Sequence, residues 1–414
     1  MRRPAATLIP IFGASLSLLF LWQSPSVVQS EVESHAELRT GASTGLEAQE
    51  SASGALGGVW YFAVSGDSRD CGNLIMPLIA RSIEGLRPAI NVAFYWHLGD
   101  FRRMTDIDCD MLRTEHPDSD CLNRHYGDLG SAEMDDYLNA AWNDFIEHQV
   151  KPFGETCVKT PFFLGIGNHE LDASRTRDDF RRTFQKWLVQ EPVHAQRMAD
   201  LDRKLNSREG ETYYHFVHKN VDFIFLDNAD DAMFDAPQIV WLTKVLNLAI
   251  DDSSINAIVV GMHKALPYST ARSHAMDASC QGLCSGQQVY DLLYHAQNQP
   301  RSTKKVYVLA SHHHAYSHDV FNTTEHHGQV LPGWVIGTAG AQQYSDDHRN
   351  CSLNYGYVLV EVRMDGTLDV QFKSVTETSL PTAPSALADY CFHHNCHAGR
   401  DDSFKGDCPC GSTR

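Results

Sequence analysis

The sequence predicts an α/β protein in which helices cover layered, mixed β-sheets. Three observations lead to this prediction. Short apolar runs rich in β-branched and aromatic residues recur from about residue 58 onward, as expected for strands buried on both faces. Amphipathic helical patterns separate several of these runs. Five of the runs end in clusters that contain Asp, Asn or His, and ligands gather at the carboxyl ends of strands in α/β sheets.

Nine apolar runs are the predicted strands. They span residues 59–64, 90–98, 161–166, 221–226, 255–260, 306–310, 334–336, 355–362 and 368–372. The last three are not separated by long helical patterns, so we expect part of a sheet to be antiparallel.

Three stretches, 133–150, 177–205 and 237–250, predict helices. In the last, Asp235 and Pro237 are typical of a helix start, and an apolar stripe follows at helical spacing. Residues 101–132 and 265–288 are interpreted as insertions between elements.

The composition limits the classes of partner. The 414 residues include 34 Lys+Arg and 52 Asp+Glu, which gives a net charge of −18. Nucleic acids and anionic membranes bind basic faces, so no nucleic-acid partner is expected. The 22 histidines supply many neutral nitrogen ligands, and the 11 cysteines indicate an oxidising compartment.

Residues 1–30 are typical of a signal peptide, so the sequence predicts a secreted protein, extracellular or periplasmic. Arg2 and Arg3 precede an apolar run over 8–22 and a small-residue cleavage site. We expect no stable membrane association after cleavage; an uncleaved signal anchor is the alternative. The other predicted parts are a flexible lead-in over 31–56, one large domain over 57–377, and a Cys/His-rich C-terminal tail over 378–414.

In an exported chain the cysteines are interpreted mainly as disulfides. The pairs closest in sequence are 109/121, 280/284, 391/396 and 408/410, which leave 71, 157 and 351 over. Spacing does not determine connectivity, and an odd total leaves at least one thiol outside an intramolecular pair. The tail has two interpretations, a small metal-binding knot or a disulfide-stapled arm.

The clusters at the strand ends are the candidate site. They are Gly66-Asp67, Gly99-Asp100, Gly167-Asn168-His169-Glu170, His263 and Ser311-His312-His313-His314. Any one of them alone is typical of a turn or of a hydrogen-bonded buried side chain. Five in order, each at a strand end, predict a metal site.

This ordered set resembles the calcineurin-like metallophosphoesterase superfamily, and more narrowly the branch related to purple acid phosphatases. The family motifs run D-x-H, GD, GNH[DE], a lone His after a strand, and GHxH. All but the first are matched here, with Ser311 in place of the last motif's glycine. The resemblance spans about 58–376. It implies a layered α/β/β/α sandwich with two mixed sheets, a metal site at the strand C-terminal ends, and a metallophosphoesterase catalytic domain over 57–377.

Residue by residue, the resemblance implies two divalent or trivalent metal ions, Zn, Mn or Fe. Asp100 would bridge them. Asn168, His263 and His312 would complete one site, and Asp67 and His314 would serve the other. His169 would be catalytic, contacting the phosphate and protonating the leaving oxygen. The implied activity is hydrolysis of small phosphate monoesters by attack of a metal-bridging hydroxide.

Two residues depart from the family pattern. Arg69 stands where D-x-H has its third ligand, and Arg103 stands where purple acid phosphatases have a tyrosine. The first metal therefore lacks one ligand, which a water or a residue such as His97 would have to supply. Arg69 is predicted to bind the substrate phosphate with its two-pronged guanidinium; a salt bridge to an acidic loop is the alternative.

Two other functions stay open at this point. One is a phosphodiesterase or nucleotide pyrophosphatase on the same binuclear core. The other is a non-catalytic secreted homologue with a degenerate first metal site.

Overall fold

The computed structural model describes residues 58–111, 131–155, 159–203, 205, 210–229, 233–276, 285–345, 355–382 and 385–398. The predicted signal peptide (1–30), the lead-in (31–56) and the last cysteine pair lie outside these residues. None of the described helices has both the length and the apolar character needed to cross a membrane.

Two mixed sheets form the centre of the fold, as predicted. The first has the order β12 (Leu368–Ser374), β11 (Gly356–Val362), β1 (Trp60–Ser65), β2 (Val92–His97) and β3 (Phe162–Leu164). The second has the order β4 (Tyr214–His218), β5 (Val221–Leu226), β6 (Ala257–Met262), β7 (Lys305–Ala310), β9 (Gly333–Ile336) and β8 (Tyr316–His318). The neighbours β1, β2 and β3 run parallel, as do β5, β6, β7 and β9, while the other pairs within these two sheets are antiparallel.

The sheets pack on one another through an aromatic layer. Phe223 of β5 lies 5.0 Å from Phe62 of β1 and 5.0 Å from Phe94 of β2, measured between ring centroids. The next residues of β5, Ile224 and Leu226, belong instead to a second core shared with the helices that follow. Because strand side chains alternate between faces, both faces of β5 are buried, which explains its continuous apolar run.

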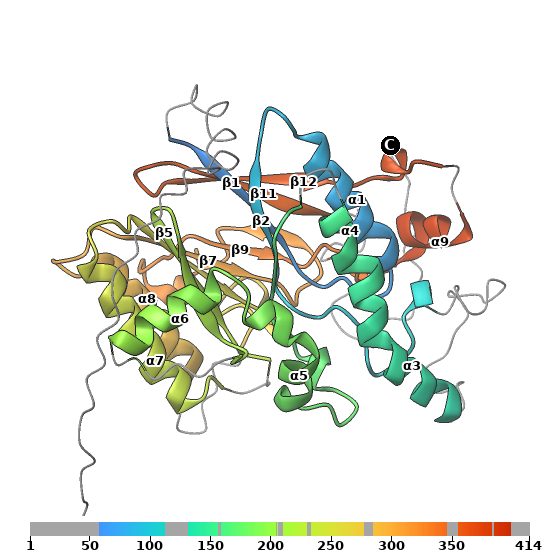
Figure 1. Cartoon of the computed structure of the whole chain (residues 1–414), viewed down its shortest axis with the longest axis horizontal. Helices are drawn as coiled ribbons and strands as arrows, with labels where there is room; N and C mark the ends of the chain where they lie inside the picture. The colour runs from blue at the N-terminus through green and yellow to red at the C-terminus, as the bar shows by residue number, and fades with distance from the viewer. Residues whose placement is uncertain are drawn as a thin grey trace, which may run out of the picture. The chain divides into compact units, whose positions relative to one another are not determined.

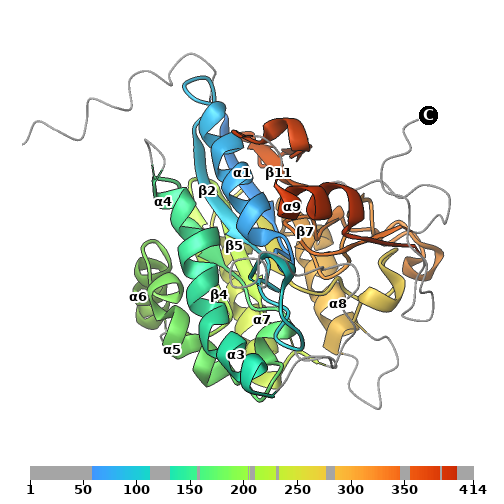
Figure 2. The same ribbon diagram turned by 90° about the vertical axis from the view of Figure 1, so that its right-hand side faces the viewer.

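Helices cover the outer faces, which completes the α/β/β/α layering (Figures 1 and 2). Figure 1 shows α1 (Gly72–Gly85) beside the first sheet, and α7 (Ala236–Asp251) and α8 (Ser285–Asn298) beside the second. The remaining helical segments are α3 (Ser131–Phe145), η2 (Ile146–Val150), α4 (Lys151–Glu155), η3 (His169–Leu171), α5 (Arg177–Leu188), α6 (Val193–Asp202), η4 (Arg272–His274), η5 (Thr324–His326), η6 (Glu377–Ser379), α9 (Ala386–Asp389) and η7 (Tyr390–His394).

The structure differs from the helix predictions in several places. The stretch 177–205 is two helices, because the residue before Pro192 is biased away from helical conformation. Helix α1 was not predicted; it begins with Gly72 and contains Pro77, both poor helix formers. Residues 265–288, interpreted as an insertion, include the start of α8 at Ser285.

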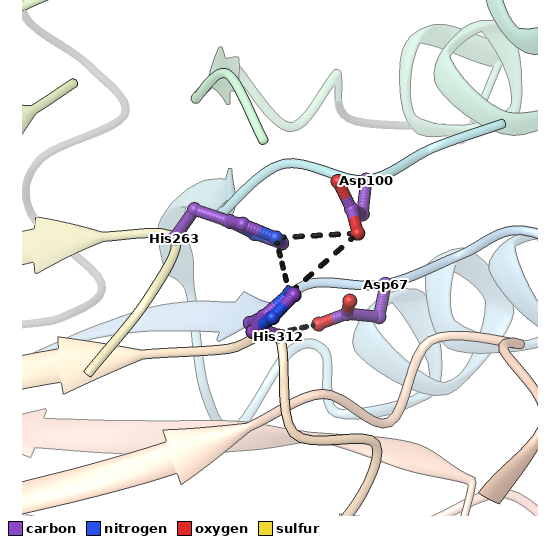
Figure 3. Close-up of side chains that lie close together, drawn as sticks. All are labelled: Asp67, Asp100, His263 and His312. Carbon is purple, nitrogen blue, oxygen red and sulfur yellow. Dashed lines mark hydrogen bonds and ion pairs between the residues drawn. The ribbon is translucent and has the colours of Figure 1, made fainter. Parts of the chain in front are cut away.

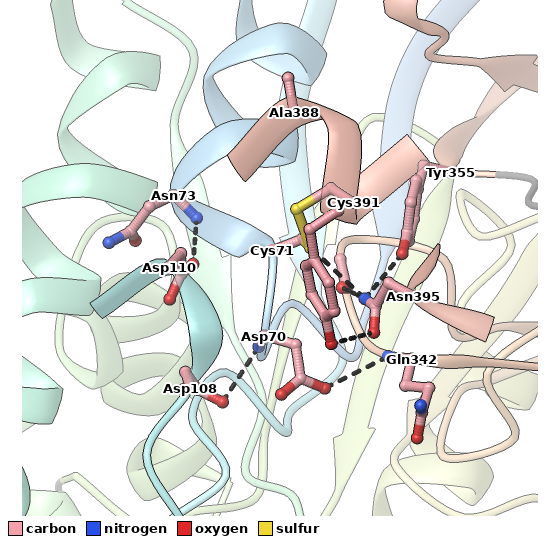
Figure 4. The surroundings of a disulfide bond; sticks show 12 residues. Asp70, Cys71, Asn73, Asp108, Asp110, Gln342, Tyr355, Ala388, Cys391 and Asn395 are labelled. Carbon is pink, nitrogen blue, oxygen red and sulfur yellow. Dashed lines mark hydrogen bonds between the residues drawn. A yellow bond between two sulfur atoms is a disulfide. The ribbon is translucent and has the colours of Figure 1, made fainter. Parts of the chain in front are cut away.

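The C-terminal tail is attached to the large domain by a disulfide between Cys71 and Cys391, 320 residues apart in sequence (Figure 4). Cys391 therefore does not pair with its sequence neighbour Cys396. The side-chain amide of buried Asn395 donates to the Tyr355 hydroxyl at 2.8 Å and to the Gly340 carbonyl at 3.1 Å. In its described part the tail is a disulfide-stapled arm, the second of the two interpretations. Its short strand β13 (Cys396–Ala398) pairs with β10 (Gln343–Ser345).

Candidate metal centre

All of the sequence-predicted ligands follow the carboxyl ends of parallel strands. Asp67, Asp100 and Asn168 come after β1, β2 and β3, which are neighbours in the first sheet. His263 and His312 come after β6 and β7, which are neighbours in the second sheet. The two sheets thus deliver the motifs to one shared edge.

Unusual backbone geometry positions these side chains. Asp67, Asp100 and His312 have φ values of 59°, 58° and 66°, a left-handed conformation that is uncommon outside glycine and clusters at functional sites. The Gly99 and Gly167 loops approach closely: a Cβ on Gly99 would lie 2.5 Å from the Gly167 nitrogen. The glycines of these two motifs therefore serve to bring Asp100 beside the next loop.

Four of the predicted ligands converge, as Figure 3 shows. Asp67, Asp100, His263 and His312 each offer one donor atom, and these atoms lie within 4.8 Å of one another. His263 Nε2 lies 3.2 Å from Asp100 Oδ2 and 3.1 Å from His312 Nδ1. It also lies 3.0 Å from Asn168 Oδ1, so the fifth predicted ligand joins the same group. We refer to Asp100, Asn168, His263 and His312 as the His263 side of the centre.

The donor atoms of this cluster fit a metal ion. Asp67 and Asp100 are fully buried, and Asp67 Oδ1 and Asp100 Oδ2 accept no hydrogen bond within the described part of the chain. A buried carboxylate oxygen without a donor is costly unless a cation neutralises it. Carboxylate, amide and imidazole donors together suit Zn, Mn or Fe.

His263 is oriented so that one ring nitrogen faces the cluster. Its Nδ1 lies 3.0 Å from the Leu98 carbonyl and 3.1 Å from Ser311 Oγ, so Nδ1 carries the proton and Nε2 is directed to Asp100. Ser311 Oγ itself donates to the Leu98 carbonyl at 3.2 Å, which gives a use to the residue that replaces the family's glycine. A protein partner on the second nitrogen is what fixes a metal-binding imidazole.

The local electrostatics favour positive charge at this place. Burial would raise the pKa of Asp100, but the charges of His263 and His169 hold it well below its usual range. Burial would lower the pKa of His263, but Asp100 raises it above its usual value. Burial and the charge of His263 lower the pKa of His312 well below its usual range, which leaves a neutral imidazole. A proton or a metal ion is therefore favoured between the carboxylate and the imidazoles.

The remaining predicted residues surround Arg69. His314 Nε2 accepts a hydrogen bond from Arg69 Nη2 at 3.0 Å and lies 3.4 Å from Asp67 Oδ1. Arg69 Nη1 also hydrogen-bonds His169 Nε2. We refer to Asp67, Arg69 and His314 as the His314 side of the centre. His169 Nδ1 lies 2.7 Å from Asp172 Oδ2, and the His169 amide donates to Asp100 Oδ1 at 3.0 Å.

His97 does not supply the missing ligand. It is fully buried, and its Nε2 lies 3.0 Å from Ser68 Oγ while its Nδ1 accepts from the Gly99 amide at 3.2 Å. Arg103, at the place of the family's tyrosine, lies 3.5 Å from Asp70 Oδ1. His97 and Arg103 thus have partners outside the set of predicted ligands.

Two residues near the centre had no role assigned from the sequence. Buried Glu170 accepts from the amides of Asp100 at 2.8 Å, Phe101 at 3.1 Å and Gly167 at 2.7 Å, so one carboxylate ties two motif loops together. Burial, together with the charge of Asp100, raises the pKa of Glu170 to about 8. Its place in Gly-Asn-His-Glu was the only signal.

The other is His274, whose ring stacks on His313 at 5.0 Å and lies 5.6 Å from the ring of His312, between centroids. No motif marks His274, which comes from a stretch that was interpreted as an insertion.

No protein-family model and no curated protein matches the chain. Among solved structures, 57 chains match. They include the purple acid phosphatase PPD1 from seeds of yellow lupin (Lupinus luteus), with 13% identity and a TM-score of 0.48 over 76% of this chain and 51% of that one.

Two further matches are PhoD and GAP50. PhoD has 13% identity and a TM-score of 0.46, over 79% of this chain and 68% of that chain. GAP50, described as the anchor in the inner membrane complex of Plasmodium, has 15% identity and a TM-score of 0.42, over 77% of this chain and 85% of that chain.

The chain thus spans about half the length of the lupin protein. The fold described above is the layered arrangement that the sequence resemblance implies. At these identities and TM-scores, the likenesses carry no conclusion about the activity of this chain.

Proposed function

We propose that this protein is a secreted, metal-dependent phosphoesterase of the calcineurin-like metallophosphoesterase superfamily, and that it hydrolyses monoesters of small phosphorylated compounds. One observation carries the proposal: donor atoms of Asp100, Asn168, His263 and His312 converge around a buried Asp100 oxygen that accepts no hydrogen bond from the described residues. The net charge of −18 favours a small substrate over a nucleic acid.

The His263 side would hold a Zn, Mn or Fe ion. When bound, such an ion lowers the pKa of a bound water and stabilises negative charge on phosphate oxygens. The sequence predicts a second ion on Asp67 and His314, with Asp100 shared between the two. On that side the imidazole of His314 already accepts a hydrogen bond from Arg69.

His169 and Arg69 would act on the phosphate together. Asp172 orients the His169 ring through Nδ1, and the opposite nitrogen, Nε2, meets Arg69 Nη1. A phosphate oxygen that accepts from Arg69 therefore lies beside His169. In the structure Nε2 accepts from Arg69 Nη1 and so carries no proton. Once the phosphate takes over that Arg69 contact, Nε2 would be free to hold a proton and to deliver it to the leaving oxygen, as a general acid.

The experiment is a substrate panel on the purified full-length protein with Zn²⁺, Mn²⁺ or Fe²⁺. Faster hydrolysis of p-nitrophenyl phosphate than of bis(p-nitrophenyl) phosphate is the expected result. The reverse preference would favour the phosphodiesterase alternative. Metal-loaded protein that hydrolyses neither ester would favour the second candidate, a non-catalytic homologue. That candidate is supported by Arg69 and Arg103, which depart from the family pattern.

A further inference from the structure

The two sides of the centre differ in what occupies their donor atoms. On the His263 side, the amide oxygen of Asn168, Nδ1 of His312 and Oδ2 of Asp100 lie 3.0–3.2 Å from His263 Nε2. On the His314 side, a side-chain cation from the protein itself lies against the imidazole. This difference is the starting point for an inference that rests on the proposed function and concerns the number of metal ions.

The lone pair of His314 is already used. His314 Nδ1 donates to the Gln342 carbonyl at 2.6 Å, so Nε2 is the acceptor nitrogen and the one that could bind a metal ion. That atom accepts from Arg69 Nη2 at 3.0 Å. A guanidinium stays protonated at any physiological pH, so it neither leaves this contact by losing a proton nor becomes a metal ligand.

Besides Asp67, His314 and the shared Asp100, the described part of the chain gives the His314 side no further protein ligand. The position three after Gly66 holds Arg69 itself, and Arg103 is directed to Asp70. Both ring nitrogens of His97 have protein partners. Asp67, Asp100 and His314 remain, next to a fixed positive charge that repels a second cation.

We propose that the Arg69 guanidinium takes the place of the first metal ion, so that the centre holds a single ion, on the His263 side. Arg69 supplies the positive charge that a second ion would have supplied beside Asp67. Its second nitrogen, Nη1, contacts His169 and so lies on the side where the phosphate is expected. A guanidinium binds phosphate oxygens in pairs but does not activate water as a metal ion does, so water activation is assigned to the His263 side alone.

The test is a metal count on full-length protein, by elemental analysis after incubation with Zn²⁺ or Mn²⁺ and gel filtration. We expect about one ion per chain in the wild type. In Arg69→His, which restores the D-x-H pattern and removes the guanidinium, we expect about two ions per chain.

Arg69→Ala is the second variant. Removal of the cation alone is expected to admit a weaker second ion, detected as a second event in calorimetric titration with Mn²⁺. Arg69 is only partly buried, and thermal melts check that both variants fold.

The matched control is Arg103→His, which changes the other departing arginine and is expected to stay at one ion. Two ions in the wild type would overturn this inference and leave the proposed function intact. One ion in the wild type and in both Arg69 variants would also overturn it, because Arg69 would then not be what excludes the second ion. A wild-type count near zero would contradict the inference and the proposed function together.

Discussion

The His263 side and the His314 side of the centre each have a carboxylate and an imidazole, but the imidazoles have different partners. Each has an imidazole fixed through Nδ1 by a main-chain carbonyl, that of Leu98 for His263 and that of Gln342 for His314. In His263 the other nitrogen faces Asp100, and in His314 it accepts from Arg69. A match to metal-ligand motifs therefore does not by itself give the number of ions, because one neighbouring side chain can occupy a ligand's lone pair.

The largest contrast is expected between alanine substitutions of the two imidazoles. His263→Ala removes the nitrogen around which the other donors gather, and should abolish metal binding and turnover. His314→Ala removes a partner of Arg69, and should leave the ion in place. Metal content and p-nitrophenyl phosphate hydrolysis would be measured for both variants. Loss of the ion in His314→Ala and its retention in His263→Ala would place the ion on the His314 side and contradict the prediction.

His169 should separate chemistry from metal binding. We expect His169→Ala to lower kcat by about 10²–10⁴-fold, the usual range for a general acid, with the metal content unchanged. The control is His318→Ala, because the His318 side chain is 66% exposed and pairs with Asp319. If His169→Ala lost the metal ion, His169 would be a ligand and not the proton donor.

Glu170 should support metal binding on the His263 side, because its carboxylate holds two of the motif loops together. Glu170→Gln loses one of the two carboxylate oxygens that accept the amides of Asp100, Phe101 and Gly167, and sets an NH₂ group against an amide donor. We expect metal affinity to fall about 10–100-fold, the range for residues behind a ligand. Calorimetry would measure this, with exposed Glu325→Gln as the control. Unchanged affinity would mean that the loops hold without this carboxylate.

Removal of the disulfide should have the smallest effect on the centre. We expect it to lower the stability of the fold and to leave metal binding unchanged. Cys71 follows Arg69 and Asp70, and Asp70 Oδ2 accepts from the amide of Gln342, whose carbonyl holds His314. The double change Cys71→Ser and Cys391→Ser should lower the free energy of unfolding by about 2–5 kcal/mol, with one ion still bound. Urea denaturation and a metal count would test this, and loss of the ion would show that the tail supports the His263 side as well.

The strands that are buried on both faces could be predicted from the sequence. Continuous apolar runs such as 221–226 and 355–362 became strands β5 and β11 almost to the residue, because both faces of each strand pack against other layers. The short strands β4, β8, β10 and β13 were not predicted. Strand β8 has no buried residue to produce an apolar run.

Only the residues of the site that belong to sequence motifs could be predicted. Asp100, Asn168, His263 and His312 are marked by glycines and by their order along the chain, and they do converge. The contact between Arg69 and His314 joins residues 245 apart in sequence, and the disulfide joins residues 320 apart. Such pairings depend on how the two sheets and the tail come together, which no local pattern contains.

The most direct test of the central claim is an anomalous difference map from crystals of the full-length protein, recorded at the absorption edge of the metal that supports hydrolysis. We predict one peak within bonding distance of Asp100, Asn168, His263 and His312, and no peak between Asp67 and His314. The ordinary electron-density map should show the Arg69 guanidinium within hydrogen-bond distance of His314. A second peak beside Asp67 and His314, or no peak among the four side chains in protein that hydrolyses phosphate esters, would contradict this prediction.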